Sequence, residues 1–399
     1  MNKLPTPKGS EALSIRKCAE NNTAFRRLND VYRNREKELL IFRENGGKVV
    51  GEIGCDVPDE LVIAAGMLPV RIYADRESSL EEADKYLELS FDPVIKAQFE
   101  KLVNGSYNDL IDFLAVSNST DVIIRTYLYL REIKRIEPDK LLPPVEFIDW
   151  LFTRKPMYKT QNEKTVKRFW ETLEEWSGRK ITQEDFIAAA EICNKDRAAL
   201  RRISELRRAH KPRITGSEAL VIIGSAFFMH RSEHAELVSQ LADDAKSWPE
   251  AEGVRLFLTG SAQESAELYT LIEKSGAVVV GEDHDWGDRF SSRDCNLSYP
   301  PLQSIVDCYM LRDFSSKKAL VSERVKTLDE AVDASGARGV IFYINAYEEA
   351  ASWDYPSEKK SLESRGILTK AFVKMSYPVS ANVGLEDKIR EFTKALGGV

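Results

Sequence analysis

The amino-acid sequence predicts an α/β protein with two open parallel sheets, a helical segment between them and a helical extension in front. Short apolar runs alternate with helix-prone runs in residues 45–155 and again in residues 213–399, as successive βαβ units do. Residues 156–212 are helix-prone throughout, and residues 1–44 form the polar, helix-prone extension. Because 399 residues are too many for one ordinary core, we expect two sheet domains of flavodoxin- or Rossmann-like type.

The first half of the chain is predicted to contain four strands with helices between them. Residues 10–44 carry an irregular apolar stripe among many charges, which favours a long surface helix or a helix pair. The expected strands are 48–53, 69–73, 110–116 and 144–147, and the expected helices are 58–65, 93–103 and 121–133.

The second half begins with a helical stretch, residues 165–208, in which residues 181–185 form a capping signal before helix 186–208. Alternation then resumes. The expected strands are 220–227, 254–259, 277–281, 339–344 and 368–373, and the expected helices are 234–246, 264–274, 302–311, 318–334, 357–364 and 385–396.

Composition excludes several classes of protein. The formal net charge of -7 weighs against a general nucleic-acid surface, and 43% hydrophobic with 30% charged residues is ordinary for a globular chain. The five cysteines show no CxxC pair, which suits a reducing compartment. No apolar run approaches the roughly 20 residues that span a bilayer, and the N-terminus has no signal-peptide core, so we expect a cytoplasmic protein without a membrane partner.

Cys55 is the residue around which the candidate chemistry gathers. It lies in the loop between strand 48–53 and a helix that starts near Pro58, with Asp59 and Glu60 in the first turn. A thiol that faces a helix N-terminus can be held as the thiolate that ligates metal or attacks an electrophile. The alternative is a small buried apolar residue that happens to be sulfur.

This region resembles the 2-hydroxyacyl-CoA dehydratase and benzoyl-CoA reductase subunit family, in which a cysteine precedes a Pro-x-Glu-Leu helix and an Ala-Gly-x-x-Pro-Val strand. A Gly-Ser after one strand, a Glu-x-x-Gly-Ala before the next and an acidic loop with glycine resemble the family too. The resemblance covers roughly residues 45–395. The matching residues are Cys55, Pro58, Glu60, Leu61, Ala65, Gly66, Pro69, Val70, Gly260, Ser261, 273–277 and 282–287.

The resemblance implies a [4Fe-4S] cluster held by three cysteines at the strand ends between the two domains. Cys55 matches the first cysteine, Thr120 is the approximate counterpart of the second, and Glu348 that of the third, so the chain looks like a divergent member that lacks two cluster cysteines. The implied location places Cys55 in the interdomain cleft, within reach of Thr120 and of residues 345–353.

The resemblance also implies a function. The chain would be a subunit of a 2-hydroxyacyl-CoA dehydratase or benzoyl-CoA reductase type enzyme, with an acyl-CoA thioester as substrate, a related subunit as partner in a heterodimer or homodimer, and an ATP-dependent iron-sulfur activator as electron donor. Because hydroxyls are poor substitutes for thiolate ligands, the alternative is a cluster-less scaffold or CoA-ester-binding subunit without activity of its own.

Other residues offer weaker candidates. His230 and His234 have a spacing that can chelate metal, but an exposed polar turn is the simpler interpretation. The acidic loop 283–288 could bind a divalent cation or position a general acid, although such loops are commonly acidic. Cys295 and Cys308 could replace the missing cluster ligands, but Cys308, like Cys193, is expected in the core, while Cys295 lies in a polar loop and is freer. A basic helix face offers either a solvated surface or a phosphate contact; it consists of Asn194, Arg197, Arg201, Arg202, Arg207 and Arg208.

Overall fold

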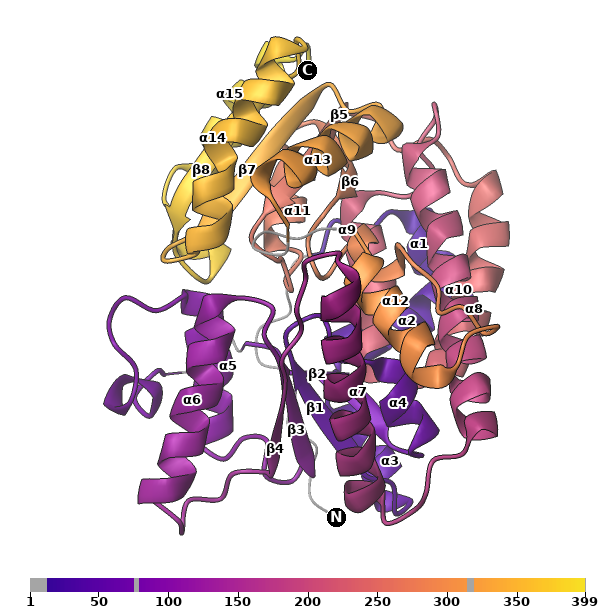
Figure 1. Cartoon of the computed structure of the whole chain (residues 1–399). Helices are drawn as coiled ribbons and strands as arrows, with labels where there is room; N and C mark the ends of the chain where they lie inside the picture. The colour runs from indigo at the N-terminus through magenta and orange to yellow at the C-terminus, as the bar shows by residue number, and fades with distance from the viewer. Residues whose placement is uncertain (1–12, 75–78, 314–318, 399) are drawn as a thin grey trace, which may run out of the picture.

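Two four-stranded sheets, each entirely parallel, form the framework of the protein, which confirms the predicted fold class (Figure 1). The computed structural model describes residues 13–74, 79–313 and 319–398. The first sheet has the order β2-β1-β3-β4 and the second the order β6-β5-β7-β8. The strands are β1 (Val49–Ile53), β2 (Leu68–Arg71), β3 (Phe113–Ser117), β4 (Val145–Ile148), β5 (Val254–Gly260), β6 (Ala277–Glu282), β7 (Gly339–Asn345) and β8 (Leu368–Met375).

Helices cover both faces of the first sheet, as its continuous buried strands require. Leu114 and Val116 point toward α5 (Pro93–Val103) and α6 (Asp121–Ile136), where they share one core. Val50 and Ala115 point the other way, toward a second core. That core is completed by α4 (Asp59–Ala64), α7 (Pro156–Ser177) and α12 (Pro301–Leu311), the last of which comes from the second half of the chain.

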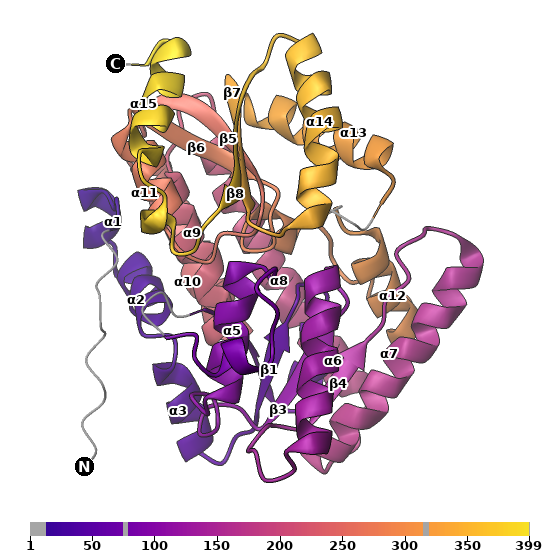
Figure 2. The same cartoon turned by 90° about the vertical axis from the view of Figure 1, so that its left-hand side faces the viewer.

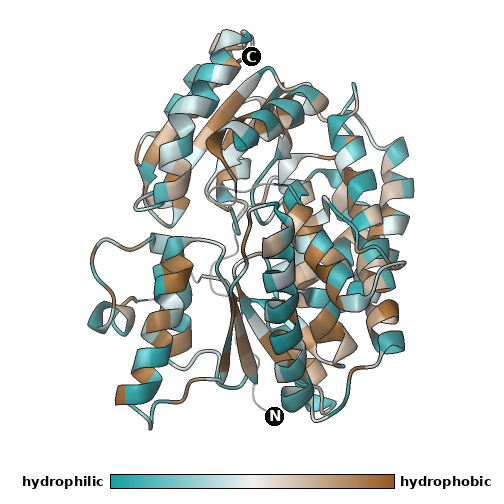
Figure 3. Ribbon diagram, viewed as in Figure 1, coloured by the Kyte–Doolittle hydropathy of each residue, from teal (hydrophilic) through white to brown (hydrophobic). Residues whose placement is uncertain are grey.

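The second sheet is covered in the same way. Phe257 and Phe342 pack against α13 (Val321–Ser335) and α14 (Glu349–Ser364). The opposite face packs against α9 (Gly216–Ser225), α11 (Glu267–Lys274) and α15 (Leu385–Ala395). Hydrophobic residues accordingly concentrate on the strands in Figure 3. Among the residues that the structure describes, no helix is both long and apolar enough to cross a bilayer.

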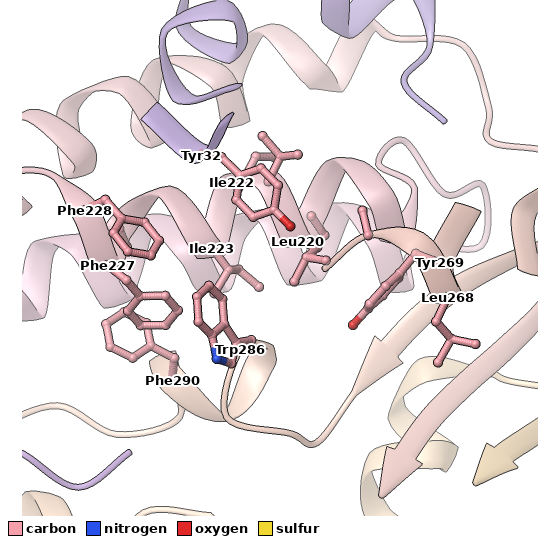
Figure 4. Close-up of a cluster of buried hydrophobic side chains, with 14 of the residues drawn as sticks. Tyr32, Leu220, Ile222, Ile223, Phe227, Phe228, Leu268, Tyr269, Trp286 and Phe290 are labelled. Atoms are coloured by element: carbon pink, nitrogen blue, oxygen red, sulfur yellow. The ribbon is translucent and has the colours of Figure 1, made fainter. Parts of the chain in front are cut away.

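The predicted strand 220–227 is wrong, because this segment is helical. Thr215 and Glu218 form a reciprocal capping box that starts α9. Every residue of α9 is buried, so its sequence shows no polar face and therefore no helical period. Figure 4 shows the reason for this burial: Leu220, Ile222 and Ile223 lie among aromatic side chains from several other elements.

The described N-terminal residues, expected to form a long surface helix or a helix pair, are helical but partly buried. They form α1 (Lys17–Asn21), α2 (Thr23–Arg33) and α3 (Lys37–Glu44), and residues 10–12 of the prediction lie outside the described part. Phe25 and Leu28 of α2 are buried. The guanidinium of Arg16 pairs with the buried carboxylate of Glu218 at 2.7 Å. In Figure 2 α1 and α2 lie along the second half of the chain, where α2 contacts α9 and α10 (Arg231–Asp244), whereas α3 lies beside the first sheet and contacts β1.

Most other predicted elements differ from the observed ones by a few residues. Helix 357–364 is longer than expected, since α14 runs through Pro356 instead of starting after it. The expected start of helix 318–334 lies outside the described residues, and α13 is seen from Val321. The remaining elements are α8 (Gln183–Arg208), η1 (Ala83–Lys85), η2 (Ala226–Phe228), η3 (Ala245–Ser247), η4 (Asp288–Ser291) and η5 (Val379–Ala381).

Candidate functional site

A cavity of about 140 Å³ lies between the carboxyl ends of the two sheets. Its lining includes Gly54 after β1 and Thr120 after β3. From the second sheet it includes Gly260 at the end of β5, and Glu348 shortly after β7. In each sheet the strand order reverses between these two central strands, and open parallel sheets bind ligands at that point. The cavity therefore joins the two binding positions that the topology favours.

Cys55 comes directly after Gly54 in the chain but does not itself line the cavity. Gly54 has a φ of +90°, and any side chain there would collide with Ser117 and Ser119. The Cys55 sulfur lies 3.4 Å from Ser119 Oγ and 3.3 Å from Asp56 Oδ2. The side chain is 5% exposed, in polar surroundings, so Cys55 is neither in an apolar core nor among the residues that line the cavity.

Two arginines from the second half of the chain close over the Cys55 loop. Arg289 donates from Nη1 to the Cys55 sulfur at 3.0 Å, and its Nη2 lies 3.3 Å from Asp56 Oδ1. Arg312 donates to the carbonyl oxygen of Cys55 at 3.0 Å. Asp56 itself has no exposed surface. The guanidinium of Arg289 thus stabilises negative charge on both the carboxylate and the sulfur.

The two predicted counterparts of cluster cysteines line the same cavity as Gly54. Thr120 is the N-cap of α6, where its hydroxyl accepts a hydrogen bond from the Ile123 amide at 3.4 Å. Glu348 is the N-cap residue of α14. Burial, together with the nearby charge of Asp92, raises the pKa of Glu348 to about 7.

Further carboxyl groups face the cavity from the second sheet and from α5. Burial raises the pKa of Asp283 to about 7 and that of Glu358 to about 7, and each is a negative neighbour of the other. Burial also raises the pKa of Asp92, the N-cap of α5, to about 6. Carboxyl groups that titrate near neutrality can donate a proton as well as accept one, which is what general acid-base chemistry requires.

With this geometry in view, comparison with known proteins decides the family. Residues 55–374 match the family described as 2-hydroxyglutaryl-CoA dehydratase, D-component. The chain belongs to this family. The resemblance inferred from the sequence is thereby confirmed.

Curated relatives of this dehydratase family match along most of their length. The beta subunit of (R)-phenyllactyl-CoA dehydratase of Clostridium sporogenes is 26% identical over 86% of this chain and 91% of the relative. The beta subunit of (R)-2-hydroxyglutaryl-CoA dehydratase of Acidaminococcus fermentans is 21% identical over 90% of this chain and 92% of the relative. One of the benzoyl-CoA reductase subunits of Thauera aromatica is 22% identical over 77% of this chain and 81% of the relative.

The residues around Cys55 do not fit a [4Fe-4S] cluster bound by three thiolates. Cys55 is the one thiol of the three matched positions, and its sulfur already contacts Arg289, Asp56 and Ser119. Among the described residues, one group of three potential ligands has its donor atoms within 4.8 Å of one another, and Cys55 is not part of it. Since such clusters need soft thiolate donors, the matched positions of this dehydratase-family chain lack the ligands that a cluster requires.

The other candidates from the sequence take structural partners. The interpretation of His230 and His234 as an exposed turn is wrong for His234, which is buried and pairs with Asp196 and with the Ile222 carbonyl. His230 packs edge-on against Phe42. The acidic loop does not converge on one point. Asp283 bonds Thr259, His284 bonds Tyr269, Asp285 pairs with Arg289, and Asp288 pairs with Arg208.

The basic face of α8 is not simply solvated. Arg197 and Arg207 are buried and pair with Glu60 and Glu282. The other arginines also pair with carboxylates; these pairs are Arg201 with Asp294, Arg202 with Asp243, and Arg208 with Asp288. Each of these guanidinium groups is thus paired within the protein, so few of their hydrogen-bond donors remain to bind a phosphate.

Sequence reasoning missed the partners of Cys55. Asp56 was adjacent and could have been considered for that reason alone. Arg289 and Arg312 had no local signal, because they lie 234 and 257 residues from Cys55 along the chain. Asp92 and Glu358 likewise carried no motif and are found only by their position at the cavity.

Proposed function

We propose that this chain is a subunit of an acyl-CoA dehydratase or acyl-CoA reductase of its family and that its cavity receives the thioester end of the substrate. The observation that carries the proposal is the cavity at both strand-order reversals, lined by carboxyl groups whose pKa is about 7. The names of the relatives support the substrate class.

The cavity offers groups of the kind that a thioester and its leaving group need. A protonated Glu348 or Asp283 can donate a hydrogen bond to a thioester carbonyl or a proton to a departing hydroxide, and the ionised form can accept a proton from carbon. Arg324 lines the same cavity, and its buried Nη1 has no hydrogen-bond partner within the described part of the chain. An acyl oxygen that approached this nitrogen would satisfy it.

The partner in this proposal is a related subunit, and the electron donor is an ATP-dependent iron-sulfur activator. Because the Cys55 loop does not present three thiolates, we assign binding and proton transfer to this chain. The cluster-less role in a complex is therefore the favoured form of the proposal, and the guanidinium of Arg289 on the Cys55 sulfur is the observation that favours it.

The test is binding of a non-hydrolysable acyl-CoA thioether, measured by calorimetry on the chain alone and with its co-expressed partner. We expect Glu348→Gln to weaken binding and to change its pH dependence near pH 7. Glu349→Gln is the matched control, since Glu349 is adjacent but exposed and is not among the lining residues. Equal binding by wild type and Glu348→Gln across pH 5–9 would contradict the role of the cavity.

Iron and acid-labile sulfide analysis of the same anaerobic preparations tests the cluster separately. We expect less than one cluster per isolated chain, with no change in Cys55→Ser. A full cluster in the isolated chain that Cys55→Ser removes would overturn the cluster-less form while leaving acyl-CoA binding as a separate question.

A further inference from the structure

Three potential metal ligands, none of which lines the cavity, meet at another place in the described part of the chain. Glu60 comes from α4, Cys295 from the loop after η4, and Cys308 from α12. Their ligand atoms lie within 4.8 Å of one another, and Cys295 Sγ lies 3.5 Å from Glu60 Oε1. All three side chains are at most 3% exposed. The sequence placed Cys308 in the core and left Cys295 in a free loop, so their convergence was not expected.

We propose that Glu60, Cys295 and Cys308 bind one soft divalent cation of the zinc type. The site does not include Cys55 and does not depend on the function proposed above.

The donor set and its spacing suit such an ion. Thiolate and carboxylate are both common ligands of Zn²⁺, at about 2.3 Å for sulfur and about 2.0–2.2 Å for oxygen. Tetrahedral geometry with those bond lengths separates neighbouring donor atoms by about 3.5–3.8 Å. The observed 3.5 Å between Cys295 and Glu60 lies in that range, and the 4.8 Å limit on the others requires only small side-chain adjustments.

The charges also balance. With both thiols protonated, the carboxylate of Glu60 is neutralised by Arg197, its buried ion-pair partner. Binding of a divalent cation releases two thiol protons, so two new negative charges meet two positive ones. The buried site is therefore neutral before and after binding, and the ion is not opposed by the general cost of burying net charge.

Surrounding residues hold the ligands in place, as the neighbours of metal ligands commonly do. The Asn194 side chain forms two hydrogen bonds with the backbone of Cys295. Its Nδ2 donates to the Cys295 carbonyl at 2.8 Å, and its Oδ1 accepts from the Cys295 amide at 2.9 Å. The hydroxyl of Tyr309 donates to Glu60 Oε2 at 2.9 Å.

The location suggests what the ion would do for the fold. Cys295 and Cys308 lie in the chain between Arg289 and Arg312, the two arginines that contact the Cys55 loop. Glu60 lies on the helix that follows this loop. A metal at the site would tie the arginine-bearing segment to the Cys55 segment and so keep both guanidinium groups in register with Asp56.

The experiment adds Co²⁺ to the reduced full-length chain under anaerobic conditions and records the thiolate-to-cobalt charge-transfer absorption. We expect one Co²⁺ per chain, displaced by Zn²⁺. Cys295→Ser and Cys308→Ser should each weaken binding at least about 10-fold and reduce the absorption. Asn194→Ala, which keeps all three ligands, should weaken binding by about 10- to 100-fold.

Two matched variants serve as controls. Cys193→Ser changes another buried thiol on α8, and Cys55→Ser changes the thiol under Arg289; neither is one of the three ligands. Both should bind Co²⁺ like wild type. The proposal is overturned if the wild type shows no charge-transfer band, if Cys55→Ser abolishes it, or if mass spectrometry finds only a Cys295–Cys308 disulfide in protein that does not bind metal after reduction.

Discussion

The two sheet edges that meet at the cavity have the same topology but opposite electrostatics. At the first edge the buried carboxylate of Asp56 is matched by Arg289 at 3.3 Å, and Arg312 approaches to 3.9 Å. At the second edge Asp283 and Glu358 lie close enough to repel each other, and burial raises the pKa of each to about 7. Paired charges hold a loop in place, whereas weakly compensated carboxyl groups are ready to exchange protons.

The first test of this difference removes the ion pair between Arg289 and Asp56 at the first edge. Arg289→Met takes the nearer guanidinium from the buried Asp56 and leaves the more distant Arg312, so we expect a loss of about 3–5 kcal/mol in the free energy of unfolding, measured with urea. The control is Arg201→Met: Arg201 and Asp294 form a pair in which both side chains are more than one-third exposed, so the loss should be below about 1 kcal/mol. A loss as small as that in Arg289→Met would show that the first edge does not depend on its ion pair.

At the second edge, removal of a charged group should raise the free energy of unfolding instead of lowering it. The folded pKa of Glu358 is above its ordinary value, so between about pH 4.5 and pH 7 the folded chain keeps a proton that the unfolded chain has released. Stability conferred by that proton is lost as pH rises through the folded pKa. Glu358→Gln removes the penalty and should raise the free energy of unfolding at pH 8 by up to about 3 kcal/mol, with little change at pH 4.

Urea unfolding of wild type and Glu358→Gln from pH 4 to pH 8 provides the measurement. Glu349→Gln, on the exposed side of the same helix, should show no such trend. If the free energy of unfolding varied with pH in the same way for wild type and Glu358→Gln, burial would not raise the pKa of Glu358.

The smallest contrast concerns Thr120 and Glu348, the two helix N-cap residues that line the cavity. The Thr120 hydroxyl accepts a hydrogen bond at the start of α6, so Thr120→Ala should cost about 0.5–1 kcal/mol. The Glu348 side chain lies near the first amides of α14 without forming a capping hydrogen bond, so Glu348→Ala should stay within about 0.5 kcal/mol of wild type at pH 5. Thermal unfolding of both variants at pH 5 compares them, and equal losses would remove the distinction.

The features that could be predicted from the sequence are those that leave a pattern over a short stretch of chain. Alternation of apolar and helix-prone runs located the eight strands of the described residues, with one false strand at 220–227. The family resemblance placed Cys55, Thr120 and residues 345–353 at the cleft; Thr120 and Glu348 do line the cavity, whereas Gly54 lines it in place of Cys55. The helix α9 was missed because burial on all sides removes the periodic signal. Pairings between distant segments were equally invisible: Arg289 reaches Cys55 across 234 residues, and Cys295 is buried in a core that contains residues of both α4 and α12.

The embedded position of α2 has a consequence for how the chain matures. Its apolar side is covered by α9 and α10, which are synthesised about 200 residues later. At about 5–20 residues per second, the interval between them is roughly 10–40 s. During that time the native partners of Phe25 and Leu28 in the second half of the chain have not yet been made. Helix α2 is thus among the earliest elements to be made, but its packing waits for α9 and α10, so newly made chains expose its apolar surface until then.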